Sequence, residues 1–153
     1  MSPKRSRHVE GRLGVYKQLS DVPDRHRLHH YDRTYARQDV WTEFRETYLE
    51  PRDHAVQPRA RRARERWTNH MAIRGRHYAL ATPEDAEMWA RELLEEYSLR
   101  YGIEGYWSQI ERFYRWLLWH TEHPHLYNPL LLAAANYDAA GVLWNAKIKR
   151  PWE

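Results

Sequence analysis

Seven arginines fall between residues 58 and 78, and Glu65 is the one acidic residue among them. Arg59, Arg62 and Arg66 are spaced by three and four residues, which places them on one face of a helix, and Arg74 can extend that line. Like charges at this density repel one another unless phosphates neutralise them. The guanidinium group of arginine can also bind phosphate oxygens or the edge of a guanine through two hydrogen bonds at once. We therefore expect this face to bind nucleic acid; the alternative is the solvated surface of an arginine-rich chain.

Charge alternates along the chain in four blocks. Residues 1–37 carry nine Lys/Arg against four Asp/Glu, a net charge of +5, and residues 58–78 carry a net charge of +6. Residues 38–57 and 79–153 carry net charges of −3 and −4. The net charge of +4 for all 153 residues therefore conceals two strongly basic segments. Clustering of this kind is typical of a protein that binds a polyanion.

A second candidate face lies on the helix expected over residues 101–122. Its outer side is predicted to carry Ser108, Arg112 and Arg115, which could contact phosphates. Arg100 stands at the start of this helix, where the helix N-terminus favours an anion. Glu104 and Glu111 are predicted to share the same outer surface, and their negative charge weakens the case for this face.

The histidines are the residues that could bind a metal. His120, His123 and His125 lie close together in the sequence, and three histidines can bind zinc. Pro124 interrupts any helix there, so we expect a helix C-terminus where partly protonated histidines meet the dipole, with no metal and no cofactor. Three more histidines of the basic N-terminal segment are expected to face a polyanion: His26, His29 and His30.

The sequence shows no residue pattern typical of a catalytic site. The chain has no cysteine, which excludes disulfides and thiol catalysis. Neither a glycine-rich phosphate loop nor a Ser/His/Asp arrangement nor a carboxylate pair on one face stands out. We expect a protein that is not an enzyme and has no small-molecule substrate.

The longest apolar-leaning run, residues 126–137, is too short and polar to span a membrane. No secretory signal is expected either, so we predict a soluble protein of the cytoplasm, associated with the nucleoid.

The elements that must position these residues are helices. Apolar residues recur at intervals of three and four over residues 39–50, 58–74, 82–97, 101–122 and 130–149, and no segment alternates as a strand does. Thr82-Pro83-Glu84-Asp85 is the clearest helix start, and Gly141 is the weak point of the last helix. The sequence therefore predicts an all-α fold of about five helices over residues 38–153, preceded by a basic arm, residues 1–37. The apolar residues that can pack this arm are Val15, Tyr16, Leu19 and Leu28. Trp107, Phe113, Tyr114 and Trp116 are expected in or near the core, whereas Trp119 is predicted to point away from it.

A resemblance covers roughly residues 38–130. In order, the chain has the Thr82-Pro83-Glu84-Asp85 helix start, the Ser98-Leu99-Arg100 turn, the pattern Tyr106-x3-Ile110-x2-Phe113-x2-Trp116-Leu117, and Asn128-Pro129. This resembles the N-terminal core-binding domain of tyrosine recombinases and phage integrases, a SAM-like helical bundle, and is similar to small integrase-like proteins of haloarchaea. The resemblance implies that the second and fourth helices cross double-stranded DNA. Catalysis in that family needs a further domain with Arg, Lys, His-x-x-Arg and a nucleophilic Tyr; the match His30-Tyr31-Asp32-Arg33 is expected by chance.

Together these observations predict a non-catalytic protein that binds double-stranded DNA, an accessory or regulatory factor of DNA integration, recombination or a mobile element. Its expected partner is double-stranded DNA, with a recombinase or a second copy of the chain as further candidates. The alternative is a helical interaction module for a separately encoded recombinase subunit. In that case the acidic second half and the tryptophan-rich helices would bind protein, and the arginines would reflect composition.

Overall fold

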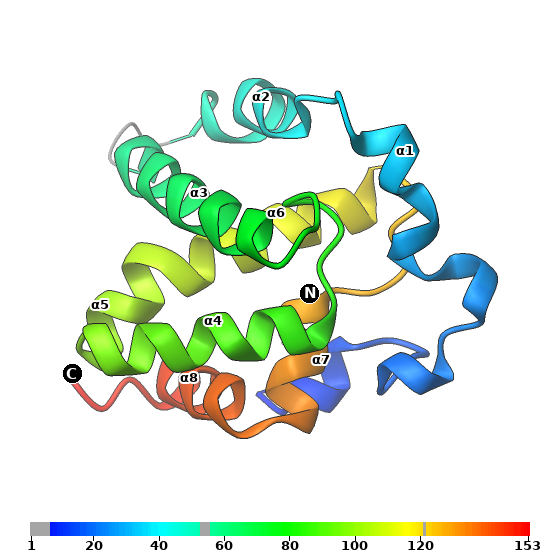
Figure 1. The fold of residues 1–153 in the computed structure, drawn as a ribbon. Helices are drawn as coiled ribbons and strands as arrows, with labels where there is room; N and C mark the ends of the chain where they lie inside the picture. Colours follow the sequence, from blue (N-terminus) through cyan, green and yellow to red (C-terminus); the bar gives the residue numbers. More distant parts are fainter. Residues whose placement is uncertain (1–6, 53–55, 121) are drawn as a thin grey trace, which may run out of the picture.

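A computed structural model describes residues 7–52, 56–120 and 122–153 of the chain. Within these ranges every regular element is helical, which confirms the all-α prediction (Figure 1). No helix of the described residues is both long and apolar enough to cross a membrane. Lys4 and Arg5 of the basic arm lie outside the described residues, as does part of the segment between the helical regions expected over residues 39–50 and 58–74.

The helices follow one another in a mostly antiparallel bundle (Figure 1). Short 3-10 turns precede them, namely η1 (Val9–Arg12), η2 (Leu19–Asp21), η3 (Asp24–His26) and η4 (Leu28–Tyr31). The α-helices are α1 (Asp32–Tyr35), α2 (Val40–Phe44), α3 (Val56–Ile73), α4 (Pro83–Glu96), α5 (Leu99–Gly102), α6 (Ser108–Trp119), α7 (Pro129–Asn136) and α8 (Asp138–Lys149). Two π-helical turns continue α2 and join α5 to α6, namely η5 (Arg45–Leu49) and η6 (Ile103–Trp107).

The five expected helical regions are all present, but the count of about five is too low because the last region is two helices, α7 and α8, and the short helices α1 and α5 add to the count. The chain breaks at Tyr137, which has an extended backbone with φ −130° and ψ 162°. Glu87 of α4 explains the restart, since its buried carboxylate accepts the N–H groups of Ala139 and Ala140 at 3.0 and 2.8 Å. Gly141, the expected weak point, lies inside α8. A Cβ there would come within 3.3 Å of the carbonyl oxygen of Ala134, so glycine allows α7 and α8 to approach closely.

The core is built around α6, whose side chains meet those of α2 and α3. The expected inner face of this helix is confirmed, because Ile110, Phe113 and Leu117 have no exposed surface. Three tryptophans from three elements pack in a row, with ring centroids 4.9 Å apart for Trp67–Trp89 and 6.2 Å for Trp89–Trp107. Trp119 is 83% exposed, as predicted from its position off the apolar face.

Residues 7–37 are packed along the bundle. Leu28 is buried, as expected, and its N–H donates to the Tyr127 hydroxyl at 3.2 Å. Tyr16 and Leu19 are half-buried against the core, whereas Val15 is 87% exposed and packs nothing. The described part of the predicted basic arm therefore belongs to the folded body of the protein.

Candidate nucleic-acid interface

Helix α3 carries most of the candidate residues, and its sequence explains how they are displayed. Its narrow apolar stripe, Ala60, Ala63, Trp67 and Met71, is fully buried, as the spacing predicts. The indole N–H of Trp67 donates to the carbonyl oxygen of Tyr78 at 2.8 Å and fixes the helix to the core. Arginines occupy the remaining faces, so their environment depends on what packs beside each face.

The N-terminal half of α3 presents an arginine ridge, which we define as Arg59, Arg61 and Arg62. All three side chains are exposed. Among the described residues, no carboxylate lies within ion-pair distance of any of them, whereas most other arginines of the bundle have such a partner. The ridge is therefore a concentrated positive charge that the described part of the protein leaves unneutralised.

A pocket of about 160 Å³ lies on one flank of the ridge. Arg59 and Arg62 line it from α3, and Arg100 lines it from α5. The side chain of Ser98 caps the helix that runs without interruption from α5 to α6, accepting the N–H of Tyr101 at 3.2 Å. Arg100 pairs with Glu104 at 3.3 Å, and both side chains are largely exposed. Three predicted site residues thus meet beside the positive end of a long helix dipole.

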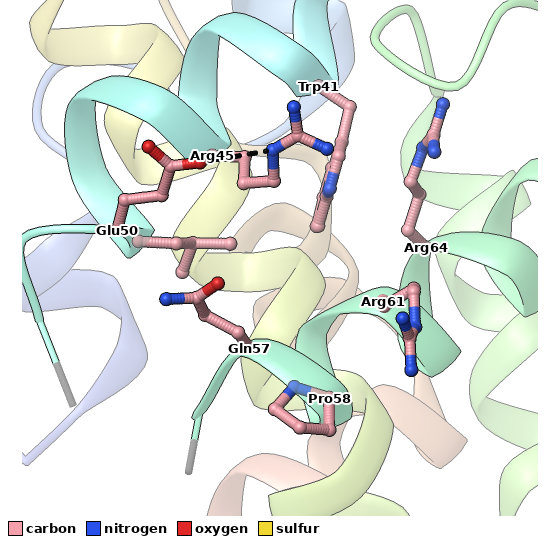
Figure 2. Close-up of a pocket in the computed structure, with 8 residues that line it drawn as sticks. Trp41, Arg45, Glu50, Gln57, Pro58, Arg61 and Arg64 are labelled. Atoms are coloured by element: carbon pink, nitrogen blue, oxygen red, sulfur yellow. Dashed lines mark ion pairs between the residues drawn. The ribbon is translucent and has the colours of Figure 1, made fainter. Parts of the chain in front are cut away.

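A larger pocket, of about 430 Å³, lies on the other flank between α2–η5 and α3 (Figure 2). Arg61 and Arg64 line it from α3, while Arg45 of η5 and Glu50, which directly follows η5, line the opposite side and form an ion pair of 3.6 Å. Arg64 also approaches Asp39 at 3.9 Å. Arg45 is not among the site residues predicted from the sequence, because nothing in the spacing of the acidic segment 38–57 indicates that η5 faces α3.

Arg66 belongs to the predicted DNA-binding face, but its guanidinium is held by contacts within the protein. Its guanidinium pairs with Glu96 at 2.7 Å and donates to the Tyr97 hydroxyl at 3.1 Å. The hydrogen bond that Arg66 donates to Glu96 lowers the pKa of the Glu96 carboxyl below its usual value. Arg66 therefore fastens α3 to the C-terminal end of α4, and its charge is largely neutralised.

Arg74 is about 22 Å along the helix axis from Arg59, given a rise of about 1.5 Å per residue. Its guanidinium contacts Asp85, which has no exposed surface, and Arg76 pairs with the same carboxylate at 2.7 Å. Asp85 also accepts the N–H of Thr82 at 2.9 Å, while Thr82 accepts the N–H of Asp85, so the predicted capping box is present. Arg74 joins the end of α3 to the start of α4.

The candidate residues on α6 are not on the open face that was expected. Glu111, predicted to point outward, is buried and pairs with Arg115 at 2.8 Å. Lys147 of α8 lies within electrostatic range of both, and burial lowers its pKa. Arg112 donates to Gln109 at 3.4 Å. Ser108, at the first position of α6, is half-buried. This side of α6 is partly covered by the C-terminal half of α8, which the sequence did not place there.

The histidines after α6 separate into two environments. His125 is buried with Nε2 at 2.6 Å from the carbonyl oxygen of Ala79, and burial lowers its pKa to about 4. His120 and His123 turn instead toward Glu43 of α2, with burial lowering the pKa of His123. The sequence could not indicate Glu43, which is 77 residues before His120.

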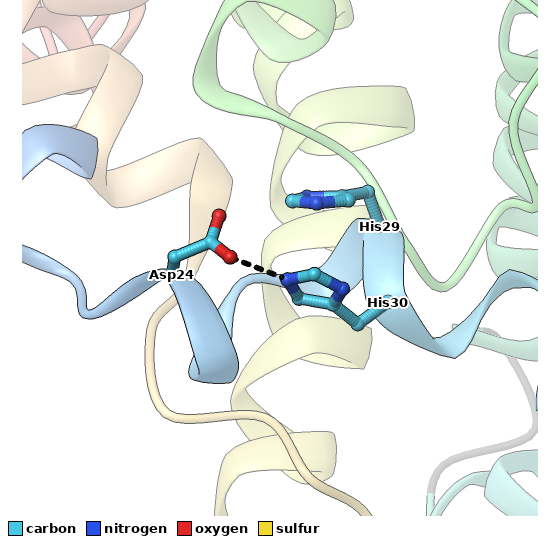
Figure 3. A group of neighbouring side chains, drawn as sticks. All are labelled: Asp24, His29 and His30. Carbon is cyan, nitrogen blue, oxygen red and sulfur yellow. Dashed lines mark hydrogen bonds and ion pairs between the residues drawn. The ribbon is translucent and has the colours of Figure 1, made fainter.

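The histidines of the N-terminal segment form a different group (Figure 3). His30 pairs with Asp24 at 3.0 Å, and the rings of His29 and His30 lie 4.0 Å apart between centroids. All three side chains are exposed and stand on single 3-10 turns. A cluster on such short elements is weakly held in position, so we assign it no ligand.

The structure thus gathers Arg59, Arg62 and Arg100 at one pocket, with Arg66 beside them in an ion pair. It leaves Arg74 at the far end of α3 and places Arg112 and Arg115 near α8. Comparison with family models, curated proteins and solved structures finds no match to this chain.

Proposed function

We propose that this protein binds double-stranded DNA through the arginine ridge of α3 and the two pockets that flank it. The observation that carries the proposal is the exposure of Arg59, Arg61 and Arg62 with no carboxylate of the described residues within ion-pair distance of them. Among the described arginines of residues 38–153, most pair with a carboxylate, while Arg52 and Arg112 hydrogen-bond to Tyr48 and Gln109, so the arginines of this range that lack such a partner cluster at the ridge. DNA phosphates, spaced about every 1.7 Å of helix axis, would supply the missing charge.

The number of phosphate contacts follows from the arginine environments. The three ridge arginines are available directly. Arg45, Arg64 and Arg100 are held by solvent-exposed pairs at 3.3–3.9 Å, and exposed pairs contribute only about 0–1 kcal/mol. Phosphate can therefore replace their carboxylates. Each neutralised phosphate contributes about −0.9 to the slope of log K against log salt, so three to six contacts give a slope of about −3 to −5.

The biological setting is part of the proposal and rests on the resemblance to the core-binding domain of tyrosine recombinases. In that setting the protein binds DNA without cutting it, as an accessory or regulatory factor of recombination or of a mobile element. The α3 ridge corresponds to the second helix of that domain, which the resemblance sets against the duplex. The contribution of the α6 face, expected from the fourth helix, is smaller because Arg115 is paired with Glu111.

The test is fluorescence anisotropy of a labelled duplex over a range of salt concentrations. The Arg59→Ala/Arg61→Ala/Arg62→Ala variant should lose about three units of slope with an unchanged far-UV spectrum. A matched control, Lys149→Ala/Arg150→Ala, removes two exposed charges at the end of α8 and should bind as the parent protein does. If the ridge variant binds normally, the ridge is only a solvated surface. If the parent protein fails to bind at low salt, the interaction-module hypothesis takes precedence.

A further inference from the structure

Two histidines three residues apart and a glutamate far from them in the sequence converge beside the C-terminal end of α6. Nε2 of His120 lies 3.3 Å from one carboxylate oxygen of Glu43, and Nε2 of His123 lies 3.4 Å from the other. One ligand atom from each residue lies within 4.8 Å of the others. From this convergence we propose that Glu43, His120 and His123 bind one divalent transition-metal ion, with zinc as the best fit.

The distances agree with the dimensions of a zinc site. Zinc binds imidazole nitrogen and carboxylate oxygen at about 2.0–2.2 Å in tetrahedral geometry, so neighbouring ligand atoms are about 3.3–3.6 Å apart. The separations of 3.3 and 3.4 Å between the histidine nitrogens and the Glu43 oxygens fall in that range. An ion could therefore enter with small side-chain adjustments.

Hydrogen bonding within the protein leaves the histidine nitrogens short of partners. Nε2 of His123 is buried and has no hydrogen-bond partner among the described residues, although it is directed at the Glu43 carboxylate. Nδ1 of His120 is also buried and has no hydrogen-bond partner in the described part of the chain. The His123 side chain is only 5% exposed. Buried polar atoms nearly always have a partner, and a metal ion shared with Glu43 would provide one for His123.

The surroundings hold the two rings in place. Nδ1 of His123 lies 2.6 Å from the Tyr35 hydroxyl, which is the outer partner that a metal-binding histidine usually has on its second nitrogen. The Trp116 ring packs against both imidazoles, with centroid distances of 4.9 Å to His120 and 5.5 Å to His123. The ligand rings are thus oriented by contacts that do not involve the ion.

The donor set also indicates which metals fit. Two imidazole nitrogens with one carboxylate favour zinc, cobalt, nickel or copper over magnesium and calcium, which prefer oxygen ligands alone. Three protein ligands leave a fourth position for water, and Glu43 and His120 retain 35% and 28% side-chain exposure. His123 and Tyr35 also line a neighbouring pocket of about 330 Å³. Bound metal would tie α2 to the end of α6.

The experiment uses the full chain, cleared of metal with a chelator and titrated with zinc in competition with a chromophoric chelator. We expect one zinc per chain, visible absorption typical of four-coordinate cobalt when Co²⁺ is substituted, and a rise in Tm with zinc. Glu43→Gln should weaken binding by more than about 100-fold, beyond the 10–100-fold loss typical of an outer partner, which is the loss expected for Tyr35→Phe. Glu122→Gln, a nearby exposed carboxylate, is the matched control and should bind zinc as the parent does.

A measurement on the unaltered protein covers the case in which a variant fails to fold. Zinc should shift the ring-nitrogen NMR signals of His120 and His123 and leave those of His29 and His30 unchanged. Absence of stoichiometric binding would overturn the proposal, as would a folded Glu43→Gln variant with unchanged affinity. Binding that disappears in His29→Ala/His30→Ala and persists in Glu43→Gln would assign the metal to the exposed N-terminal group instead.

Discussion

Replacement of Asp85 by alanine should destabilise the protein more than replacement of any arginine of the ridge. Asp85 has no exposed surface, and its carboxylate is contacted by Arg74, by Arg76 and by the N–H of Thr82. The alanine variant loses half of the capping box at the start of α4. It also leaves two guanidinium groups without their shared acid.

The expected magnitude follows from these contacts. Loss of an N-terminal capping interaction costs about 0.5–2 kcal/mol, and removal of one partner from a buried ion pair costs about 3–5 kcal/mol. The second figure must be reduced, because the side chains of Arg74 and Arg76 are 25% and 36% exposed and can be rehydrated. We therefore expect a loss of about 2–4 kcal/mol for Asp85→Ala, a decrease in Tm of roughly 4–16 °C at about 2–4 °C per kcal/mol.

The assay is urea unfolding followed by tryptophan fluorescence and far-UV circular dichroism. Arg74→Ala should cost about 1.5–3 kcal/mol, the range for a hydrogen bond to a charged group, and the double variant with Asp85→Ala should be less destabilised than the sum of the two. Arg62→Ala, an exposed arginine of the same helix, is the control and should stay within about 0.5 kcal/mol of the parent. An Asp85→Ala variant that also stays within 0.5 kcal/mol would refute the reasoning, and Arg74 would again be a candidate for DNA contact.

Two further predictions concern helix starts. Glu87→Ala should cost about 1–3 kcal/mol in urea unfolding, because two N–H groups at the start of α8 lose a buried charged acceptor; a Glu87→Gln variant, which keeps one acceptor, should lose less, and equal losses would contradict this account. Asp39 accepts the N–H and hydroxyl of Thr42 at 3.2 and 2.5 Å, and these bonds lower its pKa. A lowered pKa stabilises the fold above the unfolded-state value of about 3.9, so the advantage of about 1 kcal/mol over Asp39→Ala should be present at pH 7 and shrink as pH falls below about 4. An advantage that persists at pH 2 would be inconsistent with this reasoning.

The apolar spacing of the sequence predicted the helical regions well. The buried stripe of α3 and the inner face of α6 both follow from residues three and four apart, since one face of a helix must be removed from water. The helix start at Thr82 could also be predicted from the sequence, because the hydrogen bonds of its capping box join residues only three apart. The break at Tyr137 was missed, because the groups that stabilise it are Glu87 of α4 and the close approach of α7 and α8.

For the candidate sites, the sequence determined which residues carry charge, and the tertiary structure decided which charges remain free. Arg59, Arg62 and Arg66 have the same helical spacing, yet Arg66 meets Glu96 of α4 while the ridge meets no described acid. The same reason explains the histidines, where Glu43 joins His120 and His123 in place of His125. Spacing along a helix sets the direction of a side chain, but an ion pair or a metal site requires partners from other helices, and only packing brings those within a few ångströms.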